Sequence, residues 1–181
     1  MPLACPYVMY NRKHIRLRDF DYSSSNAYFI TICTKSFGCY FGEIRNGIMG
    51  YSEIGNAASC LLQEIQERRP NINVDEFIVM PNHIHCVIEI DGNSFSFENT
   101  NQYGKPIAGS ISTIVNQYKG AVKKWCNVNE YSGFEWQPRS YDRVIRNNEE
   151  YFAIKDYILA NPLNWERDKL HAVLSTEYRI K

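Results

Sequence analysis

The sequence lacks the segments that mark membrane-spanning or disulfide-linked secreted proteins. No apolar run approaches the roughly 20 residues that a transmembrane helix needs. No apolar stretch of the signal-peptide type follows the basic residues near its start. The six cysteines form no C-x-x-C pair, and several lie in apolar segments. We therefore expect buried free thiols in a reducing cytoplasm, and neither a disulfide framework nor a zinc knuckle.

The chain also lacks an excess of charge of either sign, because 20 lysine and arginine residues balance 20 aspartate and glutamate residues. A neutral total argues against nonspecific binding to polyanions, but the basic residues are clustered. The clusters are Arg12, Lys13, Arg16 and Arg18; Lys119, Lys123 and Lys124; and Arg139, Arg143 and Arg146. The sequence alone leaves open whether they form one basic patch or ordinary solvated surface.

What is present is enough apolar sequence for one folded domain. The chain has 181 residues, and 44% of them are hydrophobic, which allows a sizeable core. We expect a basic N-terminal arm over residues 1–27, one domain over 28–165 and a C-terminal tail over 166–181. Residues 91–106, rich in Asn, Ser, Gly and Phe, are expected to form a flexible loop.

The order of the predicted elements indicates the fold class. Apolar, β-branched runs predict strands at 28–34, 74–80, 83–90 and 140–145, with a hairpin at 40–48 that turns at Asn46-Gly47. Helical spacing predicts helices at 52–69, 110–125 and 148–160. This order suits an α+β fold of the ferredoxin-like or RRM-like type, in which helices pack on an antiparallel sheet.

Two of the four histidines, His83 and His85, are separated by one isoleucine in an apolar strand. Alternate strand residues share a face, so the two imidazoles lie roughly 7 Å apart and can close on one divalent cation. The alternative is a pair of hydrogen-bonded structural histidines. A histidine-triad nucleotide hydrolase would need a third histidine, but Val87 occupies that position.

The helix near the C-terminus offers the second half of a possible site. Its apolar stripe is predicted to contain Tyr151, Phe152, Ile154, Ile158 and Leu159. Tyr157 and Asn161 are four positions apart, so they project from neighbouring points at the margin of this stripe. An ordinary half-buried tyrosine would have the same spacing. Periodicity does not select a nucleophile among 13 tyrosines.

Four stretches resemble a known family in the same order along the chain. The string Met80-Pro-Asn-His-Ile-His85 resembles the HUH signature (His, hydrophobic, His) of the single-tyrosine transposases. The other stretches resemble the REP-associated tyrosine transposases of that group. They are Arg16-Leu-Arg-Asp-Phe-Asp-Tyr22 with Tyr28-Phe-Ile-Thr-Ile-Cys-Thr34, Trp136-Gln-Pro-Arg-Ser-Tyr-Asp-Arg-Val-Ile-Arg146, and Asp156-Tyr-Ile-Leu-Ala-Asn-Pro162. Together the matches cover roughly residues 12–165.

The resemblance implies an HUH endonuclease fold, which agrees with the ferredoxin-like prediction. It implies that Tyr157 is the nucleophile, that His83 and His85 are metal ligands, and that Asn161 is a third ligand. The metal would be Mg²⁺ or Mn²⁺. The implied reaction nicks single-stranded, hairpin-forming DNA and transfers the strand through a 5′-phosphotyrosine. Lys155, Asp156 and water remain open as general bases.

The same resemblance sets the expected partners. Phosphate contacts are expected first from Arg139, Arg143 and Arg146 and then from the lysine cluster, while the N-terminal arm would hold a DNA hairpin. The protein is expected in the bacterial cytoplasm, at the nucleoid when bound to DNA, as a monomer or a homodimer. Two alternatives are a domesticated protein that binds hairpin DNA without cutting it and a histidine-triad-like nucleotide hydrolase.

Overall fold

A four-stranded antiparallel sheet organises the computed structural model, which describes residues 26–91 and 109–171. Its strands are β1 (Asn26–Cys33), β4 (Ile72–Val79), β5 (His83–Ile90) and β6 (Tyr141–Val144), in the spatial order β4-β5-β1-β6. Helix α1 (Glu53–Arg68) connects β1 to β4, and α2 (Ile111–Val128) connects β5 to β6. This β-α-β-β-α-β arrangement with antiparallel neighbours is ferredoxin-like. The predicted fold class is confirmed.

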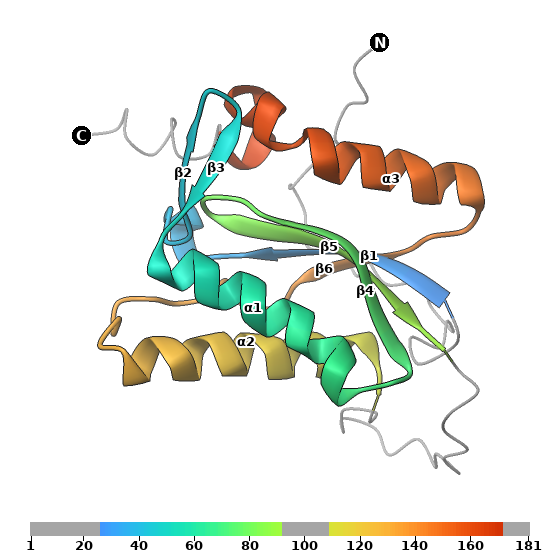
Figure 1. Ribbon diagram of the computed structural model, residues 1–181, viewed down its shortest axis with the longest axis horizontal. Helices are drawn as coiled ribbons and strands as arrows, with labels where there is room; N and C mark the ends of the chain where they lie inside the picture. Colours follow the sequence, from blue (N-terminus) through green and yellow to red (C-terminus); the bar gives the residue numbers. More distant parts are fainter. Residues whose placement is uncertain (1–25, 92–108, 172–181) are drawn as a thin grey trace.

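The sheet separates two layers of helix (Figure 1). Helices α1 and α2 cover one face, and α3 (Asn148–Ala160) lies on the other. The short 3-10 helix η3 (Pro162–Arg167) follows α3, while another, η1 (Lys35–Phe37), follows β1. Strands β2 (Gly42–Arg45) and β3 (Ile48–Tyr51) form a separate hairpin. Its turn residues Asn46 and Gly47 have φ angles of 53° and 74°, as a tight hairpin turn requires.

Each long helix begins at a polar side chain that accepts a hydrogen bond from a backbone N–H of the first turn. Ser52 accepts from Gly55 at the start of α1, and Ser110 accepts from Thr113 at the start of α2. Asn147 accepts from Glu150 at the start of α3 over 2.8 Å. These caps satisfy N–H groups that a helix leaves unpaired, which explains where the helices begin.

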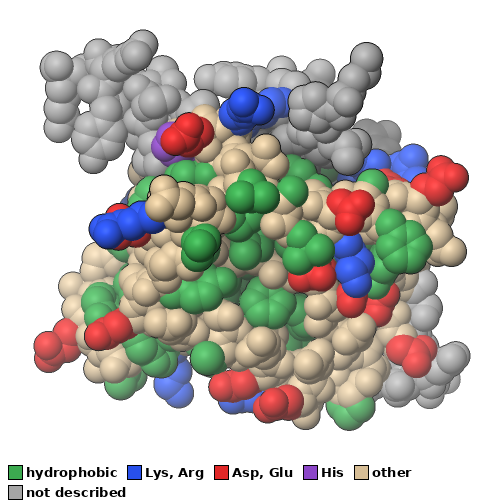
Figure 2. Space-filling view, turned by 45° about the horizontal axis from the view of Figure 1, so that its top comes forward, with side chains coloured by type: hydrophobic (Ala, Val, Ile, Leu, Met, Phe, Trp, Pro, Cys, Tyr) green, Lys and Arg blue, Asp and Glu red, His purple; other side chains and the backbone are tan. Residues whose placement is uncertain are grey.

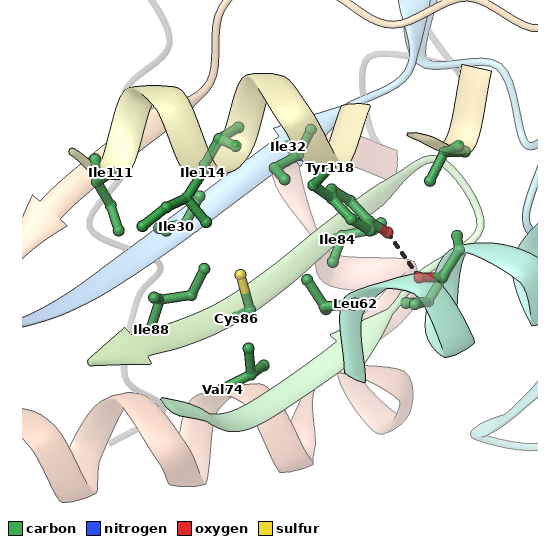
Figure 3. Packing of buried hydrophobic residues seen from close by; sticks show 14 of the residues in the cluster. Ile30, Ile32, Leu62, Val74, Ile84, Cys86, Ile88, Ile111, Ile114 and Tyr118 are labelled. Carbon is green, nitrogen blue, oxygen red and sulfur yellow. Dashed lines mark hydrogen bonds between the residues drawn. The ribbon is translucent and has the colours of Figure 1, made fainter. Parts of the chain in front are cut away.

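The main core lies between the sheet and the helix pair. Alternate residues of the central strands face it, including Ile84, Cys86 and Ile88 of β5, and all three are essentially inaccessible to solvent. Figure 3 shows them opposite the helices with Tyr118 of α2, whose hydroxyl donates to the Ala58 carbonyl over 2.8 Å. This face is apolar and buried, so it holds β5 against the helix pair.

A smaller cluster fixes α3 to the opposite face. Phe29, Val87, Ile145 and Ile158 form its buried centre. A β-bulge between Val74 and Phe77 interrupts the pairing of β4. Asp75 lies in this bulge and accepts hydrogen bonds from Tyr151 over 2.5 Å and from Lys155 over 2.8 Å, both on α3. The bulge therefore clamps the helix to the sheet edge.

The predicted stripe of α3 was wrong at two positions. Phe152 and Leu159 are each 61% exposed, because the face of α3 that packs on the sheet, with Tyr151, Ile154, Tyr157 and Ile158, is narrower than predicted. With the top of Figure 1 turned forward, hydrophobic side chains gather across the middle of the view (Figure 2).

The described cysteines are all free, but the prediction that they are buried holds only in part. Cys33, Cys86 and Cys126 are buried, whereas Cys39 and Cys60 are exposed. Within the described ranges, no helix combines the length and apolar character needed to cross a bilayer.

Several sequence predictions lie outside the described residues. They are Cys5, the N-terminal arm up to residue 25 with Arg12, Lys13, Arg16 and Arg18, almost all of the 91–106 loop, and the last ten residues of the tail. The division of the chain into arm, domain and tail therefore stays a prediction.

Candidate functional site

The two histidines of β5 face α3 from the middle of the sheet. His85 is paired with Thr31 of β1 on one side and with Ile78 of β4 on the other. His83 is 0% exposed and His85 is 2% exposed. Their ring centroids lie 4.5 Å apart. The alternation of the strand therefore brings both imidazoles together on the face opposite the main core.

Each imidazole is oriented by a polar neighbour at Nδ1. Nδ1 of His83 lies 2.7 Å from Oδ1 of Asn82, and Nδ1 of His85 lies 2.9 Å from Oγ1 of Thr31. The Asn82 oxygen can only accept, so His83 carries its proton on Nδ1 and Nε2 keeps a free lone pair. In metal-ligating histidines, the ring nitrogen that does not bind the metal usually makes a hydrogen bond of this kind.

Burial keeps both rings uncharged. It lowers the pKa of His83 well below the ordinary value, and the neighbouring His85 adds to the effect. Burial also lowers the pKa of His85 to about 3. Neutral imidazoles at neutral pH are the form that binds a metal ion.

Tyr157 reaches the pair from α3. Its hydroxyl lies 3.3 Å from Nε2 of His85, and its ring meets Phe29 edge-on with centroids 6.1 Å apart. The clamp at Asp75 and the burial of Ile158 fix the helix on which Tyr157 stands. A phenol from the C-terminal helix and an imidazole from mid-chain are therefore within contact of each other in one chain.

Asn161 lies at the C-terminal end of α3, one turn beyond Tyr157. It is 2% exposed. Among the described residues, neither its Oδ1 nor Nε2 of His83 has a hydrogen-bond partner, although both atoms are buried. Buried polar atoms are normally paired, and two unpaired atoms of ligand type fit a site for a cation.

A carboxylate that the sequence analysis missed lies at the same place. One ligand atom each from His83, His85 and Asp168 fall within 4.8 Å of one another, so these three residues could hold a metal ion. Asp168 directly follows η3, in what was expected to be an irregular tail. No periodicity marks it in the sequence, and only the turn of the chain after Pro162 brings it back to the sheet.

The structure does not gather all the predicted basic residues at this site. Arg143 of β6 is on the histidine face, opposite Phe29 and two residues along the strand from the position opposite Thr31, and its guanidinium pairs with Glu150. Arg139 and Arg146 are exposed.

The lysine cluster belongs to α2, across the sheet from α3. Lys119 donates to the carbonyls of Gln137 and Arg139, and Lys123 donates to that of Phe134. Lys124 is exposed. These lysines lie on the opposite side of the sheet from the histidine pair, and two of them support the 134–139 segment.

The proposed general bases differ in their surroundings. Lys155 donates to Asp75, and this hydrogen bond raises the pKa of the ammonium group. A lysine held in its charged form has no lone pair with which to accept a proton, which argues against its use as a base. Asp156 is exposed on α3.

Replacing Asn82 with alanine should lower the free energy of unfolding by about 2 kcal/mol, because the buried Nδ1–H of His83 then loses its acceptor. Urea denaturation in the presence of EDTA measures the change. The matched control is Asn73→Ala, which removes an exposed amide bonded to Glu89 and should cost under about 0.5 kcal/mol. Equal effects of the two substitutions would contradict the role given to Asn82.

Comparisons with known proteins agree with the fold. A solved structure of a REP-associated tyrosine transposase bound to a REP hairpin superposes with a TM-score of 0.52 at 19% sequence identity, covering 88% of this chain and 74% of that one. No protein-family model matches the chain. An uncharacterized protein of Haemophilus influenzae is 34% identical over 170 residues, which span 90% of this chain and 94% of that protein.

The antiparallel sheet with its helices has the same fold as this REP-associated tyrosine transposase. The resemblance drawn from the sequence is confirmed at this level. By sequence, the chain belongs to the same family as the Haemophilus influenzae protein.

Proposed function

We propose that the protein is a metal-dependent transposase that nicks and rejoins single-stranded, hairpin-forming DNA. The observation that carries the proposal is the contact between the Tyr157 hydroxyl and Nε2 of His85, at 3.3 Å, beside the buried His83. A purely structural tyrosine has no need of a neutral imidazole at its hydroxyl, nor of a second imidazole and a carboxylate beside that imidazole. The likeness in fold to a transposase that binds a REP hairpin supports the same assignment.

In the proposed step, the Tyr157 oxygen attacks the phosphorus of a phosphodiester. A bond forms between the phenolic oxygen and phosphorus, and the bond from phosphorus to the 3′ oxygen breaks. The phenol loses its proton, and the 3′ oxygen leaves with one as a 3′-hydroxyl. The 5′-phosphotyrosine keeps the energy of the broken ester, so the reverse attack by a 3′-hydroxyl rejoins DNA without ATP.

His83, His85 and Asn161 would hold the metal ion. The fit rests on two neutral rings with Nδ1 already engaged and on the unpaired Nε2 of His83 and Oδ1 of Asn161. When bound there, Mg²⁺ or Mn²⁺ would polarise the phosphoryl oxygen and orient the scissile group. The packing of Phe29 against both Tyr157 and His85 keeps the phenol aligned with the rings.

Phosphate contacts are proposed first for the basic residues on the histidine side of the sheet. Arg143 is the best placed, since it pairs with Phe29, which lies two residues from Thr31 on the face that carries His85. A DNA phosphate would compete with Glu150 for its guanidinium. Arg139 and Arg146, both exposed, would add contacts along the strand.

The alternatives are weaker in the light of this geometry. A histidine-triad hydrolase needs a nucleophilic imidazole where Val87 is fully buried under Ile158 in the α3 cluster. A domesticated protein that only binds hairpins would have no need for the contact between Tyr157 and His85. Because the phenol and imidazole belong to the same chain, a monomer could carry out the chemistry.

The proposal predicts a covalent adduct. The purified full chain should be incubated with hairpin oligonucleotides carrying single-stranded flanks, in Mn²⁺ or Mg²⁺, and resolved on a denaturing gel. We expect a labelled species of protein plus DNA that EDTA prevents. A fully paired duplex of the same sequence is the control and should give none. Binding of the hairpin with no adduct in either metal would favour the non-cleaving alternative.

A further inference from the structure

Asp168 is a buried carboxylate at the histidine pair. It is 9% exposed, and one of its oxygens lies within 4.8 Å of a ring nitrogen of both His83 and His85. It lies beyond α3, outside the segments whose resemblance assigned the other site residues. Its place at the site is therefore an observation of the fold alone.

The charge of Asp168 takes part in no ion pair of the described structure, although His171 and Lys169 act on it electrostatically, in the direction that lowers its pKa. None of the ion pairs within residues 26–91 and 109–171 includes it. Leu170 donates its backbone N–H to Oδ1 over 2.7 Å. Burial raises the pKa of the carboxyl, and the neutral rings of His83 and His85 bring no positive charge. Buried carboxylates are normally paired in direct contact with a cation or bound to a metal ion, and this one has no such contact among the described residues.

The segment that carries Asp168 is linked to His83 in two ways, through hydrogen bonds of Asn82 and through the ring of Trp165. Asn82 accepts at its Oδ1 from His83 and donates through Nδ2 to the Leu170 carbonyl over 3.1 Å. Leu170 in turn donates to Asp168. Trp165 is buried, and the centroid of its ring lies 6.1 Å from that of the His83 ring. One asparagine therefore aligns both the imidazole and the carboxylate, which is how a preformed ligand set is built.

We propose that Asp168 is the anionic ligand of a divalent cation held together with His83 and His85. This inference rests on the metal site of the proposed function and adds to it a residue from the segment after the tyrosine helix. With Asn161 as a neutral ligand, the set contains two imidazoles, one amide oxygen and one carboxylate. The carboxylate supplies the only formal negative charge among them, and oxygen ligands of this kind favour Mg²⁺ and Mn²⁺ over softer metals.

The test is Mn²⁺ binding by the full chain without DNA, measured by titration calorimetry and by electron paramagnetic resonance of the free ion. Asp168→Asn keeps the shape and the acceptor for the Leu170 N–H but removes the charge. We expect its dissociation constant for Mn²⁺ to rise by at least about tenfold. The matched control is Glu166→Gln, which removes an exposed acid two positions away and should leave the constant unchanged.

Thermal unfolding shows whether the variant is folded. In EDTA, Asp168→Asn should melt at or above the temperature of the wild type, because a buried charge outside any ion pair is lost. Added Mn²⁺ should raise the melting temperature of the wild type much more than that of the variant. A residue that merely accepts the Leu170 N–H would give an equal rise in both proteins.

The outcomes separate this inference from the function on which it rests. Equal Mn²⁺ affinity in the wild type and Asp168→Asn would overturn the role of Asp168 and leave the tyrosine chemistry standing. A wild-type chain that bound no Mn²⁺ would overturn the inference and the metal requirement together. Tenfold weaker binding with an intact fold in EDTA would support the inference even if no DNA adduct were found.

Discussion

Replacing Tyr157 with phenylalanine should abolish the covalent protein–DNA adduct and leave hairpin binding nearly intact. The substitution removes one oxygen, the atom proposed to bond to phosphorus, and no other group can replace it. Adduct formation should fall by at least about 10³-fold, as is typical when a nucleophile is deleted. Quantifying the adduct on denaturing gels, beside a binding isotherm for the same hairpin, measures both quantities.

The fold should tolerate this substitution. The phenylalanine ring keeps the edge-on contact with Phe29, and the lost hydrogen bond to His85 is long at 3.3 Å. The matched control is Tyr151→Phe on the same helix, whose hydroxyl bonds to Asp75 and not to a histidine. That variant should still form the adduct. An adduct that persisted in Tyr157→Phe would eliminate Tyr157 as the nucleophile.

Replacing His83 with alanine should produce the second large loss. The substitution removes Nε2, a buried atom that has no hydrogen-bond partner among the described residues. It also removes Nδ1, which is hydrogen-bonded to Asn82. Removing a metal ligand takes away the charge stabilisation at the phosphoryl group, so cleavage should fall by at least about 10²-fold. Excess Mn²⁺ should not restore it fully, because the ligand set stays incomplete. Initial rates of cleavage across a Mn²⁺ titration measure the effect.

His171→Ala is the control for the loss of an imidazole near the site. His171 packs on Trp165, with ring centroids 4.6 Å apart, and does not belong to the proposed ligand set. We expect it to cleave at close to the wild-type rate. Circular dichroism of both variants would show whether they are folded. If His83→Ala retained full activity in the presence of a chelator, the metal role would be wrong.

Local patterns were sufficient to predict most of the architecture. Caps at Ser52 and Ser110 and the Asn46-Gly47 turn act over a few residues, so they can be recognised without knowledge of the fold. On α3, the exposure of Phe152 and Leu159 depends on how much of the sheet the helix covers, and the sequence does not contain that information directly.

The residues of the candidate site were predictable only where they belong to a regular strand or helix. His83 and His85 share a face because strands alternate, and Tyr157 and Asn161 share one because helices repeat. Nothing in the sequence distinguishes Thr31 from other strand residues, and only the pairing of β1 with β5 shows that it lies opposite His85. Asp168 belongs to an irregular segment whose path depends on contacts of Asn82 and Trp165 with His83. Long-range contacts of this kind leave no periodic signal.

Because side chains alternate along β5, the residues that stabilise the core and the residues proposed for the chemistry lie on opposite faces of the strand. Even-numbered side chains such as Ile84 and Cys86 belong to the packed core, whereas His83 and His85 project to the other side. Adjacent residues of this strand are therefore under different selective pressures. A lineage could lose or alter its chemistry at the odd positions while the even positions preserve the scaffold, so inactive descendants with the same shape are an accessible evolutionary outcome.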